Sequence, residues 1–331
     1  MPILLVLLIL FFATYPTSGA AFRSSANISN ILAGQSVTGI IALAMVIPLA
    51  AGYFDLSIAA IAGVANVAAA SIIVTHGQSI WVGMLGALVI GAVIGAANGV
   101  LVAYLKVNGL IVTLGTYTVL GGLLSWYTQG ASISGVPASF GNWGSLKWLG
   151  IPRPFWLLIV VGLIIWYGLM HTPFGREFEA VGSNDSAARL VGIRVERLVF
   201  RSFVLAGLMA GIAGILLTST SGGADPSAGQ SYLFPALAAV FLGATTIRPG
   251  KYNVWGTIIG IFFVAVGVTG FTLMGAEVVW VTPVFDGGVL IAAVTISTIV
   301  GRQHVAYTMV MAPKPDETIT ISEADNVTGE A

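Results

Sequence analysis

Residues 79–104 read SIWVGMLGALVIGAVIGAANGVLVAY, a run without a single Asp, Glu, Lys or Arg. A helix needs about 20 apolar residues to cross the hydrocarbon core of a bilayer, so this run is long enough to span a membrane. Other apolar segments of similar length lie before and after it in the chain. Residues 26–33 form a short amphipathic stretch before the second apolar segment from the N-terminus. The sequence therefore predicts an all-α polytopic membrane protein with about ten transmembrane helices, at 3–20, 34–51, 55–75, 79–104, 108–128, 153–172, 198–221, 230–246, 252–273 and 281–300.

The composition agrees with a membrane bundle. Of 331 residues, 57% are hydrophobic and 8% are charged, whereas a soluble domain carries about 25% charged residues. The 42 glycines suit helices that pack closely in a bilayer. The chain has no cysteine, which excludes disulfides and thiolate metal sites, and its zero net charge leaves no basic tract for nucleic acid.

The basic residues predict an orientation. With the N-terminus in the cytoplasm and ten alternating spans, three of the 13 Lys and Arg residues fall outside, namely Arg23, Lys147 and Arg153. The others fall inside, as the positive-inside rule requires, which places both termini in the cytoplasm. The inside group is Lys106, Arg176, Arg189, Arg194, Arg197, Arg201, Arg248, Lys251, Arg302 and Lys314.

The chain divides into one transmembrane domain, 1–301, and a polar tail, 302–331. The tail is acidic and has few large apolar residues and no helical period, so we predict a disordered cytoplasmic segment. No Lys or Arg precedes the first apolar segment, so it is interpreted as a helix and not as a secretory signal.

One candidate site is Gly52-Tyr53-Phe54-Asp55-Leu56-Ser57. An acid among apolar segments is costly, which makes Asp55 a functional hypothesis. Asp55 and Ser57 are also good helix N-caps, and Pro48 would kink the helix before them. The structural interpretation as a cap is favoured, although a broken helix can also line a transport pathway.

A second candidate is the long polar loop 173–197, predicted to be cytoplasmic. Ser183 or Asn184 can cap a short helix that ends at Gly192. Ala187, Ala188 and Leu190 would give that helix a small apolar face, which suits docking into a groove of another protein. An ordinary surface loop is an equally good interpretation from these residues alone.

Glycines and polar residues within the spans have simpler interpretations. Glycines recur at every fourth position, which indicates close helix packing, at Gly91, Gly95, Gly99, Gly207, Gly211, Gly256 and Gly260. Several uncharged polar residues could line a wet path or bond to neighbouring helices, namely Asn66, Asn98, Thr113, Thr116, Tyr117, Thr118, Ser125 and Thr269.

Missing motifs narrow the function. The pattern of a nucleotide-binding P-loop does not occur, because Gly250-Lys251 is followed by Tyr252. The three histidines lack metal-ligand spacing, and no nucleophile–base pair is readable, so we expect no cofactor, no metal and no enzyme activity. Acids within the spans are limited to Asp55 and Asp286, too few for a proton relay.

From about residue 30 to 300 the chain resembles the permease subunits of bacterial ATP-binding-cassette importers for monosaccharides such as ribose, xylose and galactose. Residues 52–57 are similar to the family's Gly-Gly-Ile/Phe-Asp-Leu-Ser signature. The loop that carries TPFGR at 172–176, AVGSN at 180–184 and AARLVGI at 187–193 resembles the family's coupling loop. Weaker similarities lie at 98–106, 111–116, 242–244, 250–251 and 255–257.

Some positions depart from the family pattern. Tyr53 stands where a second glycine is usual, Ala59 where a glycine often follows, and Asn108-Gly109 where a proline-containing pair is common. Asp286 stands where a neutral amide or a basic residue is expected. These departures concern the cargo, because related permeases carry nucleosides, branched-chain amino acids or sugar-like signals.

The resemblance implies an ATP-driven importer in the bacterial inner membrane. Two permease chains, identical or different, would enclose the pathway, a cytoplasmic ATPase would bind the coupling loop, and a separate sugar-binding protein would deliver the cargo. The predicted pathway residues are Asp55, Ser57, Asn98, Thr113 and Tyr117. The predicted ATPase-coupling residues are Glu179, Gly182, Asn184, Ala187, Ala188 and Gly192.

Two other classes of function remain open from the sequence. A secondary transporter driven by an ion gradient would need more buried acids than the chain offers. A scaffold without transport would leave the Pro48–Ser57 break and the long loop without a purpose.

Overall fold

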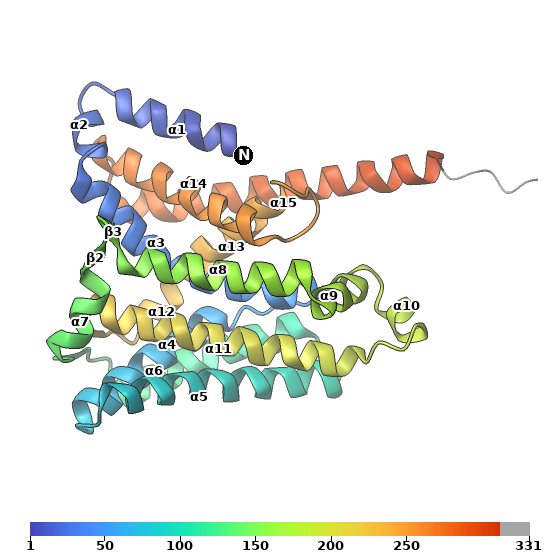
Figure 1. The fold of residues 1–331 in the computed structure, drawn as a ribbon, viewed down its shortest axis with the longest axis horizontal. Helices are drawn as coiled ribbons and strands as arrows, with labels where there is room; N and C mark the ends of the chain where they lie inside the picture. The colour runs from blue at the N-terminus through green and yellow to red at the C-terminus, as the bar shows by residue number, and fades with distance from the viewer. Residues whose placement is uncertain (312–331) are drawn as a thin grey trace, which may run out of the picture.

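The computed structural model describes residues 1–311, and the side chains of residues 1–296. It is a bundle of long helices (Figure 1). The helical elements in chain order are α1 (Pro2–Thr14), α2 (Gly19–Phe22), α3 (Ser25–Ala50), α4 (Ile58–Ala70), the π-helix η1 (Ser71–Thr75), α5 (Ile80–Gly99), the π-helix η2 (Val100–Tyr104), α6 (Gly109–Thr128), α7 (Ala138–Ser145), α8 (Arg153–His171), α9 (Pro173–Ser183), α10 (Asp185–Leu190), α11 (Val195–Ser221), α12 (Ala228–Ser231), α13 (Leu233–Ala244), α14 (Val254–Leu273) and α15 (Val278–Met311).

Two antiparallel pairs of short strands accompany the helices. Strand β1 (Ile133–Ser134) pairs with β4 (Gly223–Ala224), so that Ile133 faces Ala224. Strand β2 (Lys147–Trp148) pairs with β3 (Ile151–Pro152), so that Lys147 faces Pro152. The first pair joins the ends of distant helices, and the second closes a tight hairpin.

The all-α membrane class is confirmed, but ten spans are not. Among the described residues, eight helical stretches are long and apolar enough to cross a membrane. The other two predicted segments are shorter: Pro2–Thr14, and Ala228–Ala244, which is broken at Tyr232. At 1.5 Å per residue α1 is roughly 20 Å long, short of the ~30 Å hydrocarbon core. The location of the termini stays a prediction.

Two helices extend beyond their predicted spans, and the division into domains stays a prediction. Helix α3 begins at Ser25, where the Ser24 hydroxyl accepts a hydrogen bond from the Asn27 amide at 3.1 Å, so the amphipathic stretch 26–33 is its first part. Helix α15 continues past the predicted domain boundary at 301 as far as Met311. The rest of the predicted tail, 312–331, lies outside the described residues.

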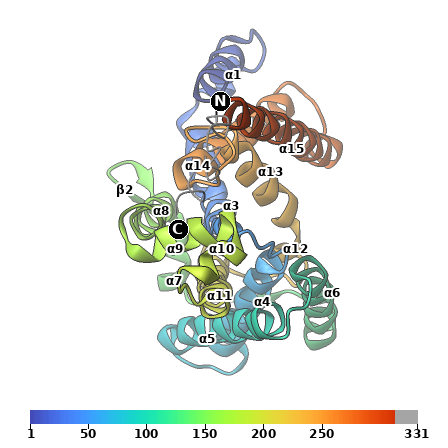
Figure 2. The same cartoon turned by 90° about the vertical axis from the view of Figure 1, so that its right-hand side faces the viewer.

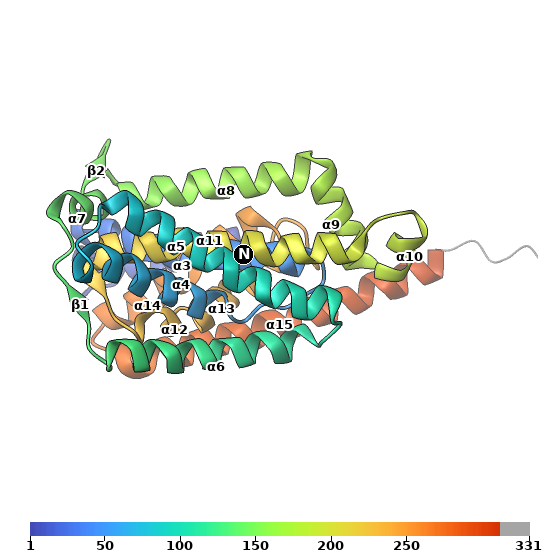
Figure 3. The same cartoon turned by 90° about the horizontal axis from the view of Figure 1, so that it is seen from below.

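Helix α3 lies at the centre of the bundle and is buried over 36–49. It packs against α8, α11, α13 and α14 (Figure 2). On one side of it α11 packs on α4 and α5, and on the other side α13 packs on α14 and α15. Figure 3 shows α6 along one flank and α8 along the opposite one.

The predicted packing role of the glycines is confirmed. A Cβ atom added at Gly91 would overlap the carbonyl oxygen of Gly207, and one at Gly95 would overlap that of Phe203. Helices α5 and α11 therefore cross with their backbones in direct contact. Gly256 and Gly260 make the same kind of contact between α14 and α13, at Gly243 and Ala239.

The basic residues divide between the two ends of the bundle. We call the end that carries α9 and α10 the basic end, and the opposite end, with α7, β2 and β3, the hairpin end (Figure 1). Ion pairs tie Lys106 to the start of α11 and Lys251 to α9, at the basic end. Lys147 and Arg153 lie in or beside the β2–β3 hairpin. These four residues lie at the ends that the prediction gave them, and which end faces the cytoplasm stays a prediction.

Candidate functional site

The segment Gly52–Ser57 is the irregular link between α3 and α4. Gly52 takes a left-handed conformation, with φ of +84°, just after α3 ends at Ala50. Non-helical backbone inside a membrane bundle needs partners for its polar groups. The amide of Tyr53 donates to the Pro48 carbonyl at 3.0 Å, and the amide of Leu56 donates to the Thr113 hydroxyl at 3.1 Å.

Four of the five predicted pathway residues meet around this link. The Ser57 hydroxyl donates to Asp55 Oδ1 at 2.5 Å and accepts from the Asn98 side-chain amide at 2.8 Å. Asn98 in turn accepts from the Thr116 hydroxyl at 2.7 Å. Together with Thr113, which bonds to the Leu56 amide, these residues join α5, α6 and the α3–α4 link. We call this set the polar cluster: Asp55, Ser57, Asn98, Thr113 and Thr116.

Asp55 is the charged member of the polar cluster and is 3% exposed. Its Oδ1 atom accepts hydrogen bonds from both the amide and the hydroxyl of Ser57. These two bonds form a local turn before α4. Its Oδ2 atom has no hydrogen-bond partner among the described residues. Ser57 is the N-cap residue of α4 but makes no side-chain cap bond. Asp55 therefore shapes the helix start and also keeps one buried oxygen free.

Tyr117, the fifth predicted pathway residue, lies outside the polar cluster. Its hydroxyl donates to the Gln230 carbonyl of α12 at 3.5 Å. Thr116, which joins the cluster, was one of several polar span residues and was not predicted as a pathway residue. Its position three residues after Thr113, on the same helical face, was the available signal.

A second buried polar contact involves Asn66 of α4. Its side-chain amide donates to the Thr218 hydroxyl at 2.9 Å and to the Gly223 carbonyl at 3.1 Å. These bonds connect α4 to α11 and β4. Asn66 therefore serves helix packing, the simpler of the two interpretations of span polar residues.

The predicted short helix in the long loop is α10. Asn184 caps it, because its side-chain oxygen accepts from the Ala187 amide at 3.0 Å. At its other end Gly192 has φ of +86°, and the Ile193 amide donates to the Ala188 carbonyl at 3.0 Å. That pattern closes a helix with a glycine in the left-handed region, as predicted for Gly192.

The predicted docking face of α10 is only partly exposed. Ala188 is 3% exposed and packs into the main hydrophobic core of the chain. Ala187 is exposed, and so are Leu190, at 89%, and Val191, at 77%. The outward apolar surface of α10 therefore consists of Ala187, Leu190 and Val191, whereas Ala188 faces the core of its own chain.

Gly182 and Glu179 hold α9 against the rest of the basic end. A Cβ atom at Gly182 would overlap the carbonyl oxygen of Ala50, at the end of α3. Glu179 forms an ion pair with Lys251. The hydrogen bond from Lys251 lowers the pKa of Glu179 below its ordinary value, against the opposing effect of partial burial.

Glu196, near the start of α11, accepts from two basic side chains. One is Lys106, at 2.7 Å, from the connection between η2 and α6. The other is Arg189 of α10, which also reaches Asp185 at 3.5 Å. This cluster of charges connects α10 to two other parts of the basic end.

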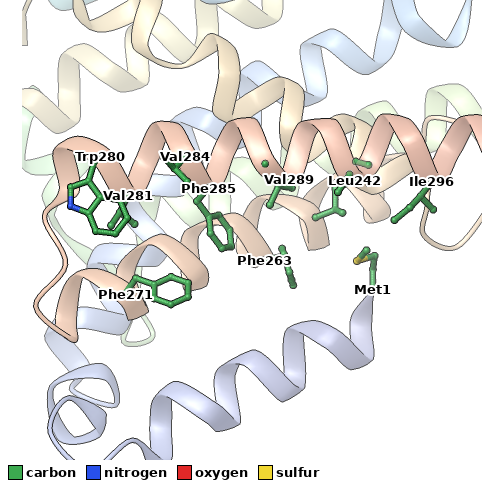
Figure 4. Close-up of a pocket in the computed structure, with 13 residues that line it drawn as sticks. Met1, Leu242, Phe263, Phe271, Trp280, Val281, Val284, Phe285, Val289 and Ile296 are labelled. Atoms are coloured by element: carbon green, nitrogen blue, oxygen red, sulfur yellow. The ribbon is translucent and has the colours of Figure 1, made fainter.

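Two larger cavities lie away from these residues. An apolar cavity of about 490 Å³ lies among α1, α13, α14 and α15, where Phe263, Phe285 and Met1 approach one another (Figure 4). A polar cavity of about 660 Å³ lies at the hairpin end, between α3, α7 and α11.

Asp286 of α15 is 3% exposed, and its Oδ1 atom has no hydrogen-bond partner among the described residues. No group of three His, Asp or Glu side chains gathers within the described part of the chain.

Comparison with known proteins identifies the family. The model of a family described as "Branched-chain amino acid transport system / permease component" matches residues 27–294. The ribose import permease protein RbsC of Escherichia coli K12 is 35% identical over 277 residues, covering 82% of this chain and 86% of that protein. The RbsC of Bacillus subtilis is 36% identical over 259 residues, 78% of this chain and 80% of that protein.

A third relative is named for a different sugar. The L-arabinose ABC transporter permease protein AraH of Azospirillum brasilense is 32% identical over 292 residues, covering 88% of this chain and 85% of that protein. No solved structure matches the chain. The family model and these relatives cover nearly the whole apolar bundle. The chain therefore belongs to this family of transport-system permease components, and it is a multi-pass membrane protein that serves transport.

Proposed function

We propose that the chain is the membrane-spanning subunit of an ATP-driven importer that moves a neutral monosaccharide across the bacterial inner membrane. The basic end would face the cytoplasm, where a separate ATPase would bind α9 and α10. A second permease chain and an external sugar-binding protein would complete the assembly. The sugars named for RbsC and AraH support this class of cargo.

The observation that carries the proposal is the exposed apolar surface of α10. Leu190 and Val191 project from a short helix outside the long spans, next to the charges of Arg189 and Asp185. Exposed apolar side chains on a capped helix are suited to a groove in a partner protein. The chain has no P-loop of its own, so a partner must supply ATP hydrolysis.

The polar cluster supports a neutral, hydroxyl-rich cargo. It offers three hydroxyls, one side-chain amide and one carboxylate oxygen, all of which can bond to sugar hydroxyls. Of these groups, the carboxylate oxygen is the one that has no hydrogen-bond partner among the described residues. Its members Ser57, Asn98 and Thr113 are at most 2% exposed, so a cargo could reach them only after the surrounding helices separate. Transport would require the α3–α4 link to move away from α5 and α6.

The test is to purify the tagged chain gently from its membrane and to identify what accompanies it. We expect a P-loop ATPase to co-purify with the unaltered chain and to be absent when the Leu190→Arg variant is purified in the same way. The matched control is Leu149→Arg, because Leu149 is 92% exposed in the β2–β3 turn at the hairpin end. The control should retain the ATPase.

Other results would point elsewhere. Absence of an ATPase from the unaltered chain, with uptake that collapses when an ion gradient is dissipated at constant ATP, would establish a secondary transporter. Uptake of nucleosides or branched-chain amino acids, but of no sugar, would retain the importer and replace its cargo.

A further inference from the structure

The β2–β3 hairpin lies directly before the span α8 and projects sideways from it. Figures 2 and 3 both show β2 beyond the flank of the bundle that α8 forms, away from the central helix α3. The hairpin ends at Pro152, and α8, which is long and apolar enough to cross a membrane, begins at Arg153. The start of a span lies near the boundary between hydrocarbon and headgroups. A hairpin that leaves this point sideways therefore stays near that boundary.

The two faces of the hairpin differ in chemistry. The Arg153 amide donates to the Leu146 carbonyl at 3.0 Å and so continues the β2–β3 pairing. Side chains two positions apart share a face of a strand, so Leu146 and Trp148 lie on one face and Lys147 on the other. Lys147 Nζ donates to the Ser29 hydroxyl of α3 at 2.7 Å, which ties its face to the bundle. Leu146 and Trp148 are exposed, so the other face is apolar and open.

The tip of the hairpin carries an apolar side chain where the backbone disfavours one. Leu149 and Gly150 connect the paired residues Trp148 and Ile151, with φ of +52° and +79°. Two-residue turns with positive φ at both positions usually carry Asn, Asp or Gly. Leu149 is 92% exposed in this conformation. Because a left-handed leucine is unfavourable and gains no burial within the chain, its side chain is suited to an apolar surface outside the chain.

Arg153 brings a positive charge to the same place. Its guanidinium lies 5.0 Å from the ring centroid of Trp148. Within the described part of the chain Arg153 forms no ion pair, and its buried Nε has no hydrogen-bond partner. Guanidinium groups bind phosphate through several N–H donors at once, and phosphates are the anions of a phospholipid surface.

We propose that the β2–β3 hairpin is a lipid anchor, in which Leu149 and Trp148 enter the bilayer interface at the hairpin end and Arg153 binds the phosphate of a phospholipid there. Aromatic and basic side chains at the ends of spans anchor helices at a fixed depth. The anchor acts on α8, because the Trp156 indole in the first turn of α8 donates to the Trp148 carbonyl at 3.3 Å. The inference rests on the membrane class of the chain and does not depend on the proposed cargo or ATPase.

The first test measures where the hairpin tip lies. The chain has no cysteine, so Leu149→Cys and Leu190→Cys can each be labelled with the same fluorophore. The two leucines are matched controls, because they are 92% and 89% exposed at opposite ends of the bundle. The labelled chains are placed in nanodiscs of phosphatidylethanolamine and phosphatidylglycerol, with part of the lipid carrying a nitroxide on the acyl chain close to the glycerol. We expect several-fold stronger quenching at residue 149 than at residue 190, which lies on α10 outside the long spans.

Two results would overturn the lipid anchor. Equally weak quenching by the nitroxide lipid at both positions, with strong quenching at residue 149 by iodide in the water, would place the tip in water. A probe at residue 149 that escapes the nitroxide lipid and responds only to an added external sugar-binding protein would make the hairpin a docking site for protein.

The second test concerns the phosphate and uses thermal unfolding in nanodiscs. Arg153→Gln is compared with Arg23→Gln, because the Arg23 guanidinium already donates to the Ala13 carbonyl at 2.7 Å. We expect the unaltered chain to unfold at a higher temperature in phosphatidylglycerol than in a glycosyl diacylglycerol, which has no phosphate. Arg153→Gln should lose most of that difference, and Arg23→Gln should retain it. An equal loss in both variants, or no difference between the lipids for the unaltered chain, would contradict the assignment of Arg153 to phosphate.

Discussion

The two ends of the bundle are built differently. At the hairpin end, backbone pairing closes the connections: β1 pairs with β4, β2 pairs with β3, and Gly144 of α7 lies directly on the backbone of α11. At the basic end, Gly182 also lies on the backbone of α3, but side-chain ion pairs connect α9 and α10 to the neighbouring segments, and Leu190 projects from α10. Paired strands and direct backbone contacts hold a connection rigidly, whereas exposed ion pairs are weak and are easily broken and formed again. The basic end is therefore the end suited to binding a moving partner.

The largest expected effect concerns the two faces of α10. Ala188→Arg would place an unpaired charge in the core, at a cost of about 3 kcal/mol or more, and should prevent stable folding. Ala187→Arg changes an exposed position and should leave the fold intact while it weakens ATPase binding. Thermal unfolding in detergent and co-purification separate the two variants. Equal stability of both would contradict the assigned faces of α10.

The next effect compares two buried asparagines. Asn98→Leu removes the acceptor of the Thr116 hydroxyl and the amide that donates to Ser57. Asn66→Leu removes the amide that donates to the Thr218 hydroxyl and leaves the Gly223 carbonyl without that donor. Each should destabilise the chain by about 1–3 kcal/mol. Only Asn98→Leu should also lower sugar uptake per folded molecule, because only Asn98 belongs to the polar cluster. Equal loss of uptake in both variants would assign the polar cluster a purely structural role.

A smaller effect is expected at the junction of Lys106, Arg189 and Glu196. Glu196→Gln removes the negative charge that Lys106 and Arg189 share at the basic end. Because these side chains are partly exposed, the loss of stability should be at most about 1 kcal/mol and should shrink as salt is raised. Ser145→Ala at the hairpin end, which removes only a bond to the Gly141 carbonyl, should show no dependence on salt. A salt-independent loss in Glu196→Gln would contradict the ionic origin.

The smallest expected effect is the loss of folding stability at low pH that comes from one carboxyl group at each end of the bundle. A hydrogen bond from Lys251 lowers the pKa of Glu179, and hydrogen bonds from Ser227 lower the pKa of Asp225 near the hairpin end. A lowered pKa gives stability that is present above the ordinary values of 4.5 for Glu and 3.8 for Asp and is lost as the pH falls below them. Salt should weaken the contribution of Glu179 alone, since Asp225 bonds to neutral groups. Unfolding curves of Glu179→Gln and Asp225→Asn against pH, at two salt concentrations, measure both.

The sequence located the Gly52–Ser57 break and the limits of α10, because both depend on neighbouring residues. A glycine, a proline and capping side chains act within a few positions of one another. It did not reveal the shared role of Thr116, nor that Ala188 faces inward. Those outcomes depend on α5, α6 and the core of the chain, which lie far away in sequence.

The sequence by itself determined the membrane class, the positions of the apolar segments, the division of basic residues and the glycine faces along which α5 and α11 pack. Each of these follows from composition or local periodicity, to which the bilayer responds directly. Only the tertiary structure decided that α1 is too short to cross the membrane, that Asp55, Ser57, Asn98 and Thr113 meet, and that Leu190 points outward. These depend on how helices separated by many residues are oriented against one another, and helical periodicity alone does not fix that orientation.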